Sequence, residues 1–452
     1  MAAYDVLREV DGSDAYANLV LPPMLRSRNI RGRDAGFATE LAYGTLRMRG
    51  RYDAILEQCS QRPLADIEAA VLDILRLGVH QLLGMRVPPH AAVSETVGLA
   101  RQRTGAGSAQ FVNAVLRRAA EHTLEEWLEL IAGAADPTGT DEEARLAAVE
   151  SHPGWIVRAL RGALKANGRD TGELEPLLAA DNAAPRVTLV TRPGLTGEGG
   201  LPDDAIPGRW APTAHVLTGG DPGSLTAVRE GRVGVQDEGS QLVALALAAT
   251  PLDGQDGLWL DLCAGPGGKA ALLGALAAER GARLVANEVA AHRVDLVRRA
   301  VVALPEGTVE VRHGDGREVG ALESGRYDRV LVDAPCTGLG ALRRRPESRW
   351  RRQPADLAGL GPLQRELLAS ALDAVRPGGL VAYVTCSPHV AETHLVVQDV
   401  LRGRDDIEVV DAADVMRTVS PEIPLSERQD VQLWPHVHGT DAMFLALLRR
   451  RA

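Results

Sequence analysis

Two cysteines and an aspartate stand where predicted strands end, and these residue types could do chemistry there. Asp333 ends the apolar strand predicted at Arg329–Asp333, and Cys336 follows three residues later. Cys386 closes a second apolar strand, Leu380–Cys386. A thiol can form a covalent intermediate, and an acid beside it can hydrogen-bond or protonate the reacting molecule. Either cysteine alone also fits a small buried side chain, but two thiols and an acid at one sheet edge favour covalent catalysis.

Such an edge requires a parallel sheet, and the second half of the chain has the pattern of one. From Leu258 onward, short apolar runs alternate with segments of helical periodicity, which predicts an α/β fold with a Rossmann-like, doubly wound, mostly parallel sheet. Ile407–Val410 and Met443–Leu448 could add an antiparallel edge. The predicted strands are Leu258–Cys263, Arg283–Val289, Val309–His313, Arg329–Asp333 and Leu380–Cys386, and the predicted helices are Gly268–Arg280, Ala291–Ala303, Leu363–Val375 and Val390–Leu401.

A glycine-rich loop follows the first of these strands and leads into a helix. Its candidate cofactor-binding residues are Cys263, Ala264, Gly265, Pro266, Gly267, Gly268 and Lys269. Glycines let a ligand approach the backbone closely, and the helix start offers free N–H donors. The spacing matches neither the phosphate-binding P-loop nor the dinucleotide fingerprint. Lys269 is one of only two lysines in the chain, which hints that a compact ammonium is required there.

Acids follow the next three strands. Glu288 is placed to accept both hydroxyls of a ribose, Asp315 to meet an adenine amino group, and Asp333 to complete the pocket. Each acid alone also fits a cap or a turn. Together with the glycine loop they predict a nucleoside pocket without a phosphate site, which suits S-adenosyl-L-methionine better than NAD or ATP.

A basic cluster follows the loop that carries Cys336. Its members are Arg343, Arg344, Arg345, Arg349, Trp350, Arg351 and Arg352. Arginines can hold phosphates, and a tryptophan can stack on a base. In a chain whose net charge is −10, this cluster beside the predicted site indicates an RNA-binding surface, although a solvated charged loop would have the same composition.

The chain length of 452 residues allows several domains. Residues 1–135 predict an all-α domain, residues 141–235 a small α/β connector, and residues 236–452 the methyltransferase-type α/β domain. The four cysteines are widely scattered and have no metal-ligand spacing, so neither a metal site nor a disulfide framework is expected. No apolar run is long enough to span a bilayer, and the N-terminus has no secretory pattern. We therefore expect a cytoplasmic monomer that makes no contact with membranes.

These motifs resemble two known families. Pro89–Val97 and Phe111–Arg118 resemble the NusB fold, an RNA-binding helical domain. Leu260–Lys269, Asp333–Gly340 and Thr385–Ser387 resemble the RsmB/Sun family of ribosomal-RNA cytosine-5 methyltransferases. That resemblance implies a nucleophilic Cys386 and a Cys336 that assists breakdown of the covalent adduct and release of RNA. It also implies S-adenosylmethionine held by the glycine loop, Glu288, Asp315 and Asp333. Gly265 and Ala270 depart from the family's Cys-Ala-Ala-Pro-Gly-Gly-Lys-Thr loop.

The chemistry of cytosine explains why such an enzyme uses a thiol. Carbon 5 is a poor nucleophile, and a thiolate that adds to carbon 6 creates an enamine able to attack a methyl group. A base must then remove the carbon 5 proton. Two other functions remain open at this stage: an amino-group methyltransferase, whose usual Asn/Asp-Pro-Pro-aromatic motif is absent here, and a non-enzymatic RNA-binding factor built on a methyltransferase fold.

Overall fold

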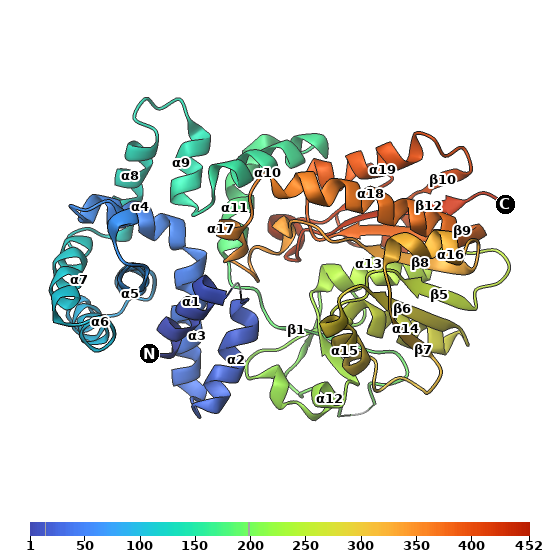
Figure 1. Ribbon diagram of the computed structural model, residues 1–452, viewed down its shortest axis with the longest axis horizontal. Coiled ribbons are helices and arrows are strands. Elements are labelled where there is room, and N and C mark those ends of the chain that lie inside the picture. Colours follow the sequence, from blue (N-terminus) through green and yellow to red (C-terminus); the bar gives the residue numbers. More distant parts are fainter. Residues whose placement is uncertain (14, 198) are drawn as a thin grey trace. The chain divides into compact units, whose positions relative to one another are not determined.

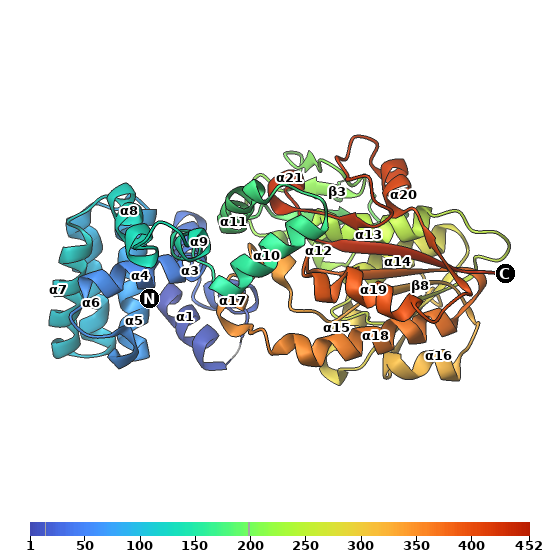
Figure 2. The same ribbon diagram turned by 90° about the horizontal axis from the view of Figure 1, so that it is seen from above.

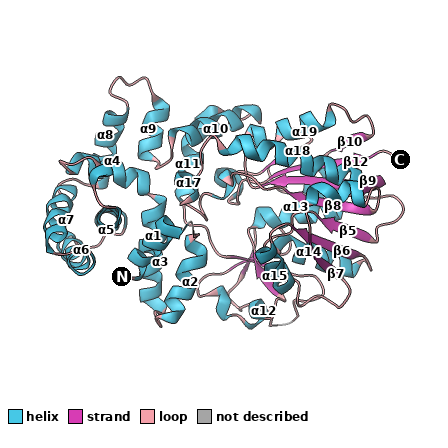
Figure 3. Ribbon diagram, viewed as in Figure 1, coloured by secondary structure: helices cyan, strands magenta, loops and turns pink. Residues whose placement is uncertain are grey.

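The computed structural model describes residues 1–13, 15–197 and 199–452, and the chain divides into two compact units (Figure 1). Unit 1 comprises Met1–Arg161, Gly172–Ala184 and Leu342–Arg352, and unit 2 comprises Gly162–Thr171, Pro185–Ala341 and Gln353–Ala452. All strands among the described residues belong to unit 2 (Figure 3). The segment 141–235, predicted as a connector, is thus divided between the two units.

Unit 1 is all-helical, as the sequence predicts. Apolar residues recur at helical spacing, and Ile55, Ile74, Leu75 and Leu116 from three different helices are completely buried in one core. Helix α10 (Gly154–Ala166) begins in unit 1 and ends in unit 2. The other helices of unit 1 are α1 (Ala2–Ser13), α2 (Ala17–Ser27), α3 (Gly32–Arg47), α4 (Arg49–Cys59), α5 (Ala69–Val79), α6 (Pro89–Arg103), α7 (Ala106–Ala119), α8 (Leu124–Ala135), α9 (Glu142–Val149), α11 (Leu174–Asn182) and α17 (Ser348–Arg351).

Unit 2 contains two sheets. The smaller one is antiparallel, with the order β2-β3-β1-β4, and the larger has the order β10-β12-β9-β8-β5-β6-β7, with β11 paired to β12. Strands β7, β6, β5, β8 and β9 are parallel, whereas β12 and β10 form the antiparallel edge that the sequence predicts. The strands are β1 (Thr188–Thr191), β2 (Ile206–Pro207), β3 (Ala214–Val216), β4 (Val233–Val235), β5 (Leu258–Asp261), β6 (Arg283–Glu288), β7 (Val309–His313), β8 (Tyr327–Asp333), β9 (Val375–Thr385), β10 (Ile407–Val410), β11 (Val431–Gln432) and β12 (Phe444–Arg450).

Helices cover both faces of the large sheet, which is why its central strands are continuously apolar. Along β8, Val330 and Val332 pack in the core of one face, and Leu331 packs in the core of the other. Helices α13 and α14 lie on the second face, and α18 and α19 on the first (Figure 2). The helices of unit 2 are α12 (Thr226–Arg229), α13 (Glu238–Ala249), α14 (Gly268–Glu279), α15 (Ala291–Ala300), α16 (Val319–Leu322), α18 (Asp356–Ala374), α19 (His394–Leu401), α20 (Ala412–Val419) and α21 (Pro435–His438).

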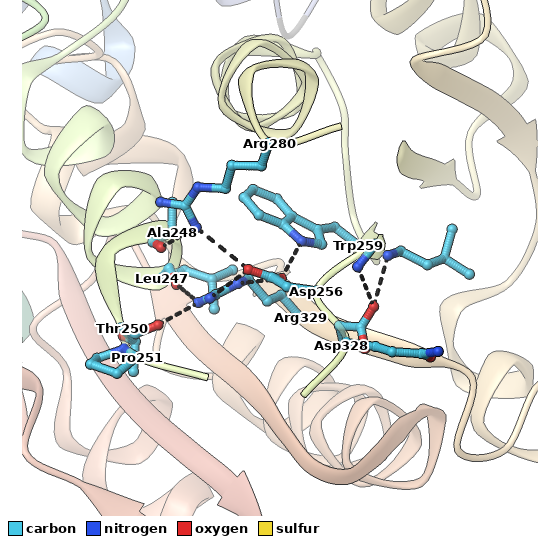
Figure 4. Close-up of polar contacts among 12 residues, drawn as sticks. Leu247, Ala248, Thr250, Pro251, Asp256, Trp259, Arg280, Asp328 and Arg329 are labelled. Atoms are coloured by element: carbon cyan, nitrogen blue, oxygen red, sulfur yellow. Dashed lines mark hydrogen bonds and ion pairs between the residues drawn. The ribbon is translucent and has the colours of Figure 1, made fainter. Parts of the chain in front are cut away.

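A buried arginine fastens the amino edge of the sheet (Figure 4). Arg329 at the start of β8 donates to both carboxylate oxygens of Asp256, at 2.8 and 2.9 Å, and to the carbonyl oxygens of Leu247 and Thr250 near the end of α13. Trp259 of β5 donates its indole N–H to Asp256 at 2.7 Å. These bonds connect the amino ends of β5 and β8 to the end of α13. They help to fix the position of the two strands relative to each other, and so the position of the side chains at their carboxyl ends.

Candidate active site at the carboxyl edge of the parallel sheet

Three neighbouring strands of the large sheet end together, and the topology reverses between two of them. β5 pairs with β6 on one side and with β8 on the other. In open α/β sheets, ligands bind beyond the carboxyl ends of the strands at such a switch point. The residues that end these strands are Asp261 of β5, Asp333 of β8 and Thr385 of β9. The edge that the sequence predicts to be functional is therefore the switch point of the fold.

The loops after β8 and β9 carry the two cysteines, and the structure brings their thiols together. The Sγ atoms of Cys336 and Cys386 lie 3.4 Å apart. The backbone N–H of Ala334 donates to the Val384 carbonyl, and that of Gly340 donates to the Cys386 carbonyl, both at 2.9 Å. The first loop is thus bound along the end of β9, and both thiols are half-buried.

The two thiols differ in their electrostatic surroundings. The hydrogen bond with Cys386, burial, and the negative charges of Cys386, Glu392 and Asp333 raise the pKa of Cys336 well above its usual range. Cys386 instead interacts with the ammonium group of Lys269. Burial acts to lower the pKa of Lys269, but the Asp333 carboxylate, and to a lesser degree Cys386, outweigh it and raise that pKa. At neutral pH Cys336 is therefore a protonated thiol, and Lys269 is a cation whose charge interacts with Cys386.

Lys269 also pairs directly with Asp333, and a third charged group is buried beside them. Its Nζ donates to Asp333 Oδ2 at 2.8 Å. Asp261 is 1% exposed, and neither of its carboxylate oxygens accepts a hydrogen bond of normal geometry from the described residues. Burial, followed by the charge of Asp333, raises the pKa of Asp261 to about 7, although Lys269 opposes the shift. Apart from a backbone contact with Cys263, which acts to lower its pKa, the Asp261 carboxylate has unused acceptor capacity, and this fits a ligand that brings donors, such as an ammonium group.

The glycine loop has the geometry that a close ligand requires. Gly267 caps α14 with φ +105°, and a Cβ there would lie 2.6 Å from the Cβ of Ala300, so only glycine fits. Gly265 donates its N–H to Glu288 Oε2 at 2.9 Å, and a Cβ at residue 265 would lie 2.3 Å from that oxygen. The departure to glycine thus permits this contact. The other departure, Ala270, is fully buried in the core between sheet and helices.

The two remaining acids predicted to bind the cofactor, Glu288 and Asp315, lie at the carboxyl ends of the neighbouring strands β6 and β7. Glu288 ends β6 and is buried, and its carboxylate accepts from the N–H groups of Gly265 and Ala290. Asp315 follows β7 and pairs with Arg317 at 2.6 Å, and this hydrogen bond holds the pKa of Asp315 below its usual range. Both carboxylates already accept hydrogen bonds from protein groups, and the lone pairs that remain can accept from a nucleoside.

The arginine cluster at residues 343–352, which the sequence predicts to bind RNA, is folded into unit 1. Arg349 is completely buried, and it donates to the carbonyls of Arg47, Ser151 and Asp181 at 2.8–3.1 Å. In this structure the Arg349 guanidinium is used to hold loops of unit 1, so the prediction that Arg349 contacts RNA gains no support from its position.

The neighbours of Arg349 are similarly engaged. Arg343 is buried, and the Trp350 ring packs on Gly50, where a Cβ would lie 2.4 Å from it. Arg345 is exposed but lies over the Tyr16 ring, with 4.9 Å between its Cζ and the ring centroid. The half-buried members are Arg344, Arg351 and Arg352. The cluster as a whole is therefore not an open basic face.

Comparisons with known proteins agree with the two units. The model of the 16S rRNA methyltransferase RsmB/F family matches residues 246–449, and the NusB family matches residues 1–121. A ribosomal RNA small subunit methyltransferase B of Pseudomonas putida is 33% identical over 99% of this chain and 97% of its own. The chain belongs to the RsmB/F family of rRNA methyltransferases. The resemblance noted in the motifs is thereby confirmed.

Further relatives of this RsmB/F-family chain match over nearly its whole length. The Mycobacterium tuberculosis protein Rv1407 is 52% identical over 99% of this chain and 96% of its own. The crystal structure of PH0851 has the same fold, with a TM-score of 0.78 at 21% identity over 99% of this chain and 97% of that one. Within the described residues, no helix has the length and apolar character needed to cross a bilayer, and no cluster of potential metal ligands occurs.

Two buried acids of the RsmB/F site were missed by the sequence analysis. Asp261 could have been found, since it ends a strand just before the glycine loop, as the predicted acids end theirs. Glu392 had no such signal, because its segment was predicted as the start of a helix. The structure instead has a short 3-10 turn at Val390–Glu392, and α19 begins only at His394.

Proposed function

We propose that this RsmB/F-family protein transfers a methyl group from S-adenosylmethionine to carbon 5 of a cytosine in small-subunit ribosomal RNA through a covalent bond to Cys386. The observation that carries the proposal is the pair of thiols 3.4 Å apart beside the Lys269–Asp333 ion pair. A reaction by way of carbon 6 needs one sulfur to bond to the base and a second group to handle protons, and this pair supplies both.

The residues at the edge fit the cofactor. Asp261 offers an orphaned buried carboxylate to a cationic group, and the glycine loop permits close approach. Residues Cys263–Lys269, together with Glu288, Asp315 and Asp333, would hold S-adenosylmethionine, which supplies an electrophilic methyl group when bound. The Lys269–Asp333 ion pair would hold both charged side chains in fixed positions beside the cofactor.

Cys386 is the better nucleophile of the two thiols. The Lys269 ammonium interacts with Cys386 and stabilises a thiolate there, whereas the pKa of Cys336 is raised by its hydrogen bond to Cys386, by burial and by neighbouring acids. The thiolate of Cys386 would add to carbon 6 of the cytosine. Asp333 would hydrogen-bond the polar edge of the ring, and the proton that the ring nitrogen gains would come from water and return to water when Cys386 leaves.

Cys336 would act after methyl transfer. The largest influences that raise its pKa include the hydrogen bond and the charge of Cys386. Once the Cys386 sulfur is bonded to carbon, that charge is gone, so Cys336 releases its proton to water more readily. Its thiolate could then accept the carbon 5 proton, and Cys386 would leave as the ring regains its double bond.

RNA contacts are expected on unit 1. Between residues 15 and 33 the chain has four arginines and no acid. Arg31 and Arg33 are exposed at the start of α3, and Phe37 in the same helix is 46% exposed. Exposed guanidinium groups beside an exposed aromatic ring can bind phosphates and stack a base. This surface, Arg31, Arg33 and Phe37, replaces the cluster at 343–352 as the candidate RNA contact.

Bisulfite sequencing of RNA tests the proposed function. Ribosomal RNA from a deletion strain should lack one or more 5-methylcytosines of the small subunit, and the purified protein with S-adenosylmethionine should restore them. An unchanged bisulfite pattern, with methylation instead at an amino group detected by mass spectrometry, would overturn the assignment to carbon 5.

A further inference from the structure

Glu392 is a fully buried carboxylate that lies behind the two thiols. It ends the 3-10 turn that follows β9 and is 0% exposed. Its Oε1 accepts from the backbone N–H of Thr337 at 2.7 Å and from the Gln364 amide at 3.3 Å. Its Oε2 accepts from the hydroxyls of Ser387, at 2.6 Å, and of Thr337. Four donors therefore converge on one carboxylate.

These donors come from the two loops that carry the cysteines. Thr337 follows Cys336 directly, and Ser387 follows Cys386 directly. Gln364 of α18 also donates to the carbonyl of Pro335, at 2.8 Å, on the other side of Cys336. Glu392 and its partners thus hold the backbone immediately before and after Cys336 and immediately after Cys386.

The hydrogen-bonding chemistry of a carboxylate suits the position of Glu392 among four donors. An ionised carboxylate only accepts hydrogen bonds, and all four of its partners can donate. Hydrogen bonds to a charged group are shorter and stronger than hydrogen bonds between neutral groups. The turn itself is fixed, because the hydroxyl of Tyr383 in β9 donates to the Glu392 carbonyl at 3.0 Å. Tyr383 thus fixes the backbone of Glu392, and the carboxylate of Glu392 in turn binds both cysteine loops.

We propose that Glu392 is a positioning residue that sets the spacing of the Cys336 and Cys386 thiols by binding both cysteine loops. This inference rests on the proposed function for its catalytic meaning, but the spacing itself can be measured without RNA or cofactor. Removal of the side chain leaves four donors without an acceptor and frees the two loops to separate.

The spacing is tested with phenylarsine oxide, whose arsenic forms two As–S bonds with a close pair of thiols and releases water. Mass mapping of the wild-type full chain should find one arsenic bridging Cys336 and Cys386. E392A should lose this bridge, whereas E392Q should retain it, because the amide keeps an acceptor for Thr337 N–H and the hydroxyls can turn. If E392A does not fold, T337V/S387A removes the hydroxyl contacts alone and should weaken the bridge.

A matched control separates positioning from general loosening. Asp328 is also buried, and it accepts from the N–H groups of Gly257 and Leu258 at 2.8 Å at the opposite edge of the sheet. D328A should retain the arsenic bridge even where it lowers the melting temperature. Equal loss of the bridge in D328A and E392A, or an intact bridge in E392A, would overturn the proposal.

Activity gives the second readout. E392A should lower kcat for methyl transfer roughly 10- to 100-fold, because a misplaced nucleophile loses its alignment, with the Kd for S-adenosylmethionine unchanged. E392Q should recover most of the kcat. A wild-type protein that methylates no RNA but shows the predicted pattern of bridging would refute the proposed function and leave the positioning role of Glu392 standing.

Discussion

Lys269 Nζ and Asp333 Oδ2 form a 2.8 Å ion pair that joins the start of α14 to the carboxyl end of β8. Lys269 is 11% exposed in its side chain and Asp333 is 27% exposed, so water screens the pair only in part. The pair leaves Asp261 as a second carboxylate beside a single ammonium. One ammonium group thus lies near two carboxylates. The more deeply buried of them, Asp261, is the one whose pKa is raised.

Asp261 should make the stability of the protein depend on pH. Its pKa is raised to about 7 by burial and by Asp333, whereas an unfolded aspartate titrates near 3.9. Between these pH values the folded protein binds the proton that the unfolded chain has released, so stability falls as pH rises from about 4 to about 7. The full effect would be about 4 kcal/mol.

The variant D261N, which cannot ionise, tests this. The melting temperature of D261N minus that of the wild type should increase as the pH rises from about 4 to about 7. Calorimetry without cofactor measures this difference. The exposed replacement D295N serves as control and should follow the wild type. Parallel curves for D261N and wild type would contradict the prediction.

The two cysteines should fail in different ways when replaced. C386A should abolish methyl transfer, because no sulfur can add to carbon 6. C336A should accumulate a covalent protein–RNA adduct, because the group expected to remove the carbon 5 proton is missing. Denaturing gel electrophoresis with labelled RNA and S-adenosylmethionine distinguishes them. An adduct with C386A and none with C336A would reverse the assigned roles.

The sequence predicted the sheet and the thiols because both depend on local patterns. Strand β8 is apolar on both faces, and its end at Asp333 is marked by the proline that follows. Adjacent parallel strands bring their ends to one edge, so Cys336 and Cys386 had to be neighbours once β8 and β9 paired.

The sequence could not predict contacts made across long separations. Arg349 lies in a run of exposed-looking charges, yet its partners are residues 47, 151, 181 and 182. Glu392 likewise belongs to a segment with helical periodicity, but bonds to two loops and to Gln364 override that local preference. Whether a charged side chain is buried depends on residues far away in the sequence, and its own segment contains no pattern that identifies those residues.

Arg349 should therefore act as a structural residue of unit 1. Burial lowers its pKa to about 10, so it is charged at neutral pH. R349A should destabilise unit 1, since each of the four acceptors that loses its donor costs about 1–3 kcal/mol. Hydrogen exchange should rise at the end of α3, after α9 and in α11, where these acceptors lie. R349K, which keeps a charge and three donors, should lose less, and the exposed replacement R298A should have no effect. Normal protection in R349A together with weakened RNA binding would restore Arg349 to the RNA surface.

Arg31 and Arg33 should contribute to RNA affinity by neutralising phosphates. The double charge reversal R31E/R33E should weaken binding to a small-subunit rRNA fragment by about tenfold or more at low salt. It should also lower the slope of log K against log salt by roughly 0.7 for each phosphate that the variant no longer neutralises. F37A should weaken binding with little change in that slope, because stacking releases no counterions.

The matched control for this charge reversal is R402E/R417E. Both of these arginines lie in unit 2, Arg402 exposed and Arg417 half-buried, and each pairs with an acid three residues earlier. The control has the same change in net charge, so it should reproduce any effect of overall charge and nothing more. Fluorescence anisotropy at several salt concentrations measures both quantities. Equal loss of affinity in the two double variants would mean that net charge, and not a surface at Arg31 and Arg33, governs the binding of RNA.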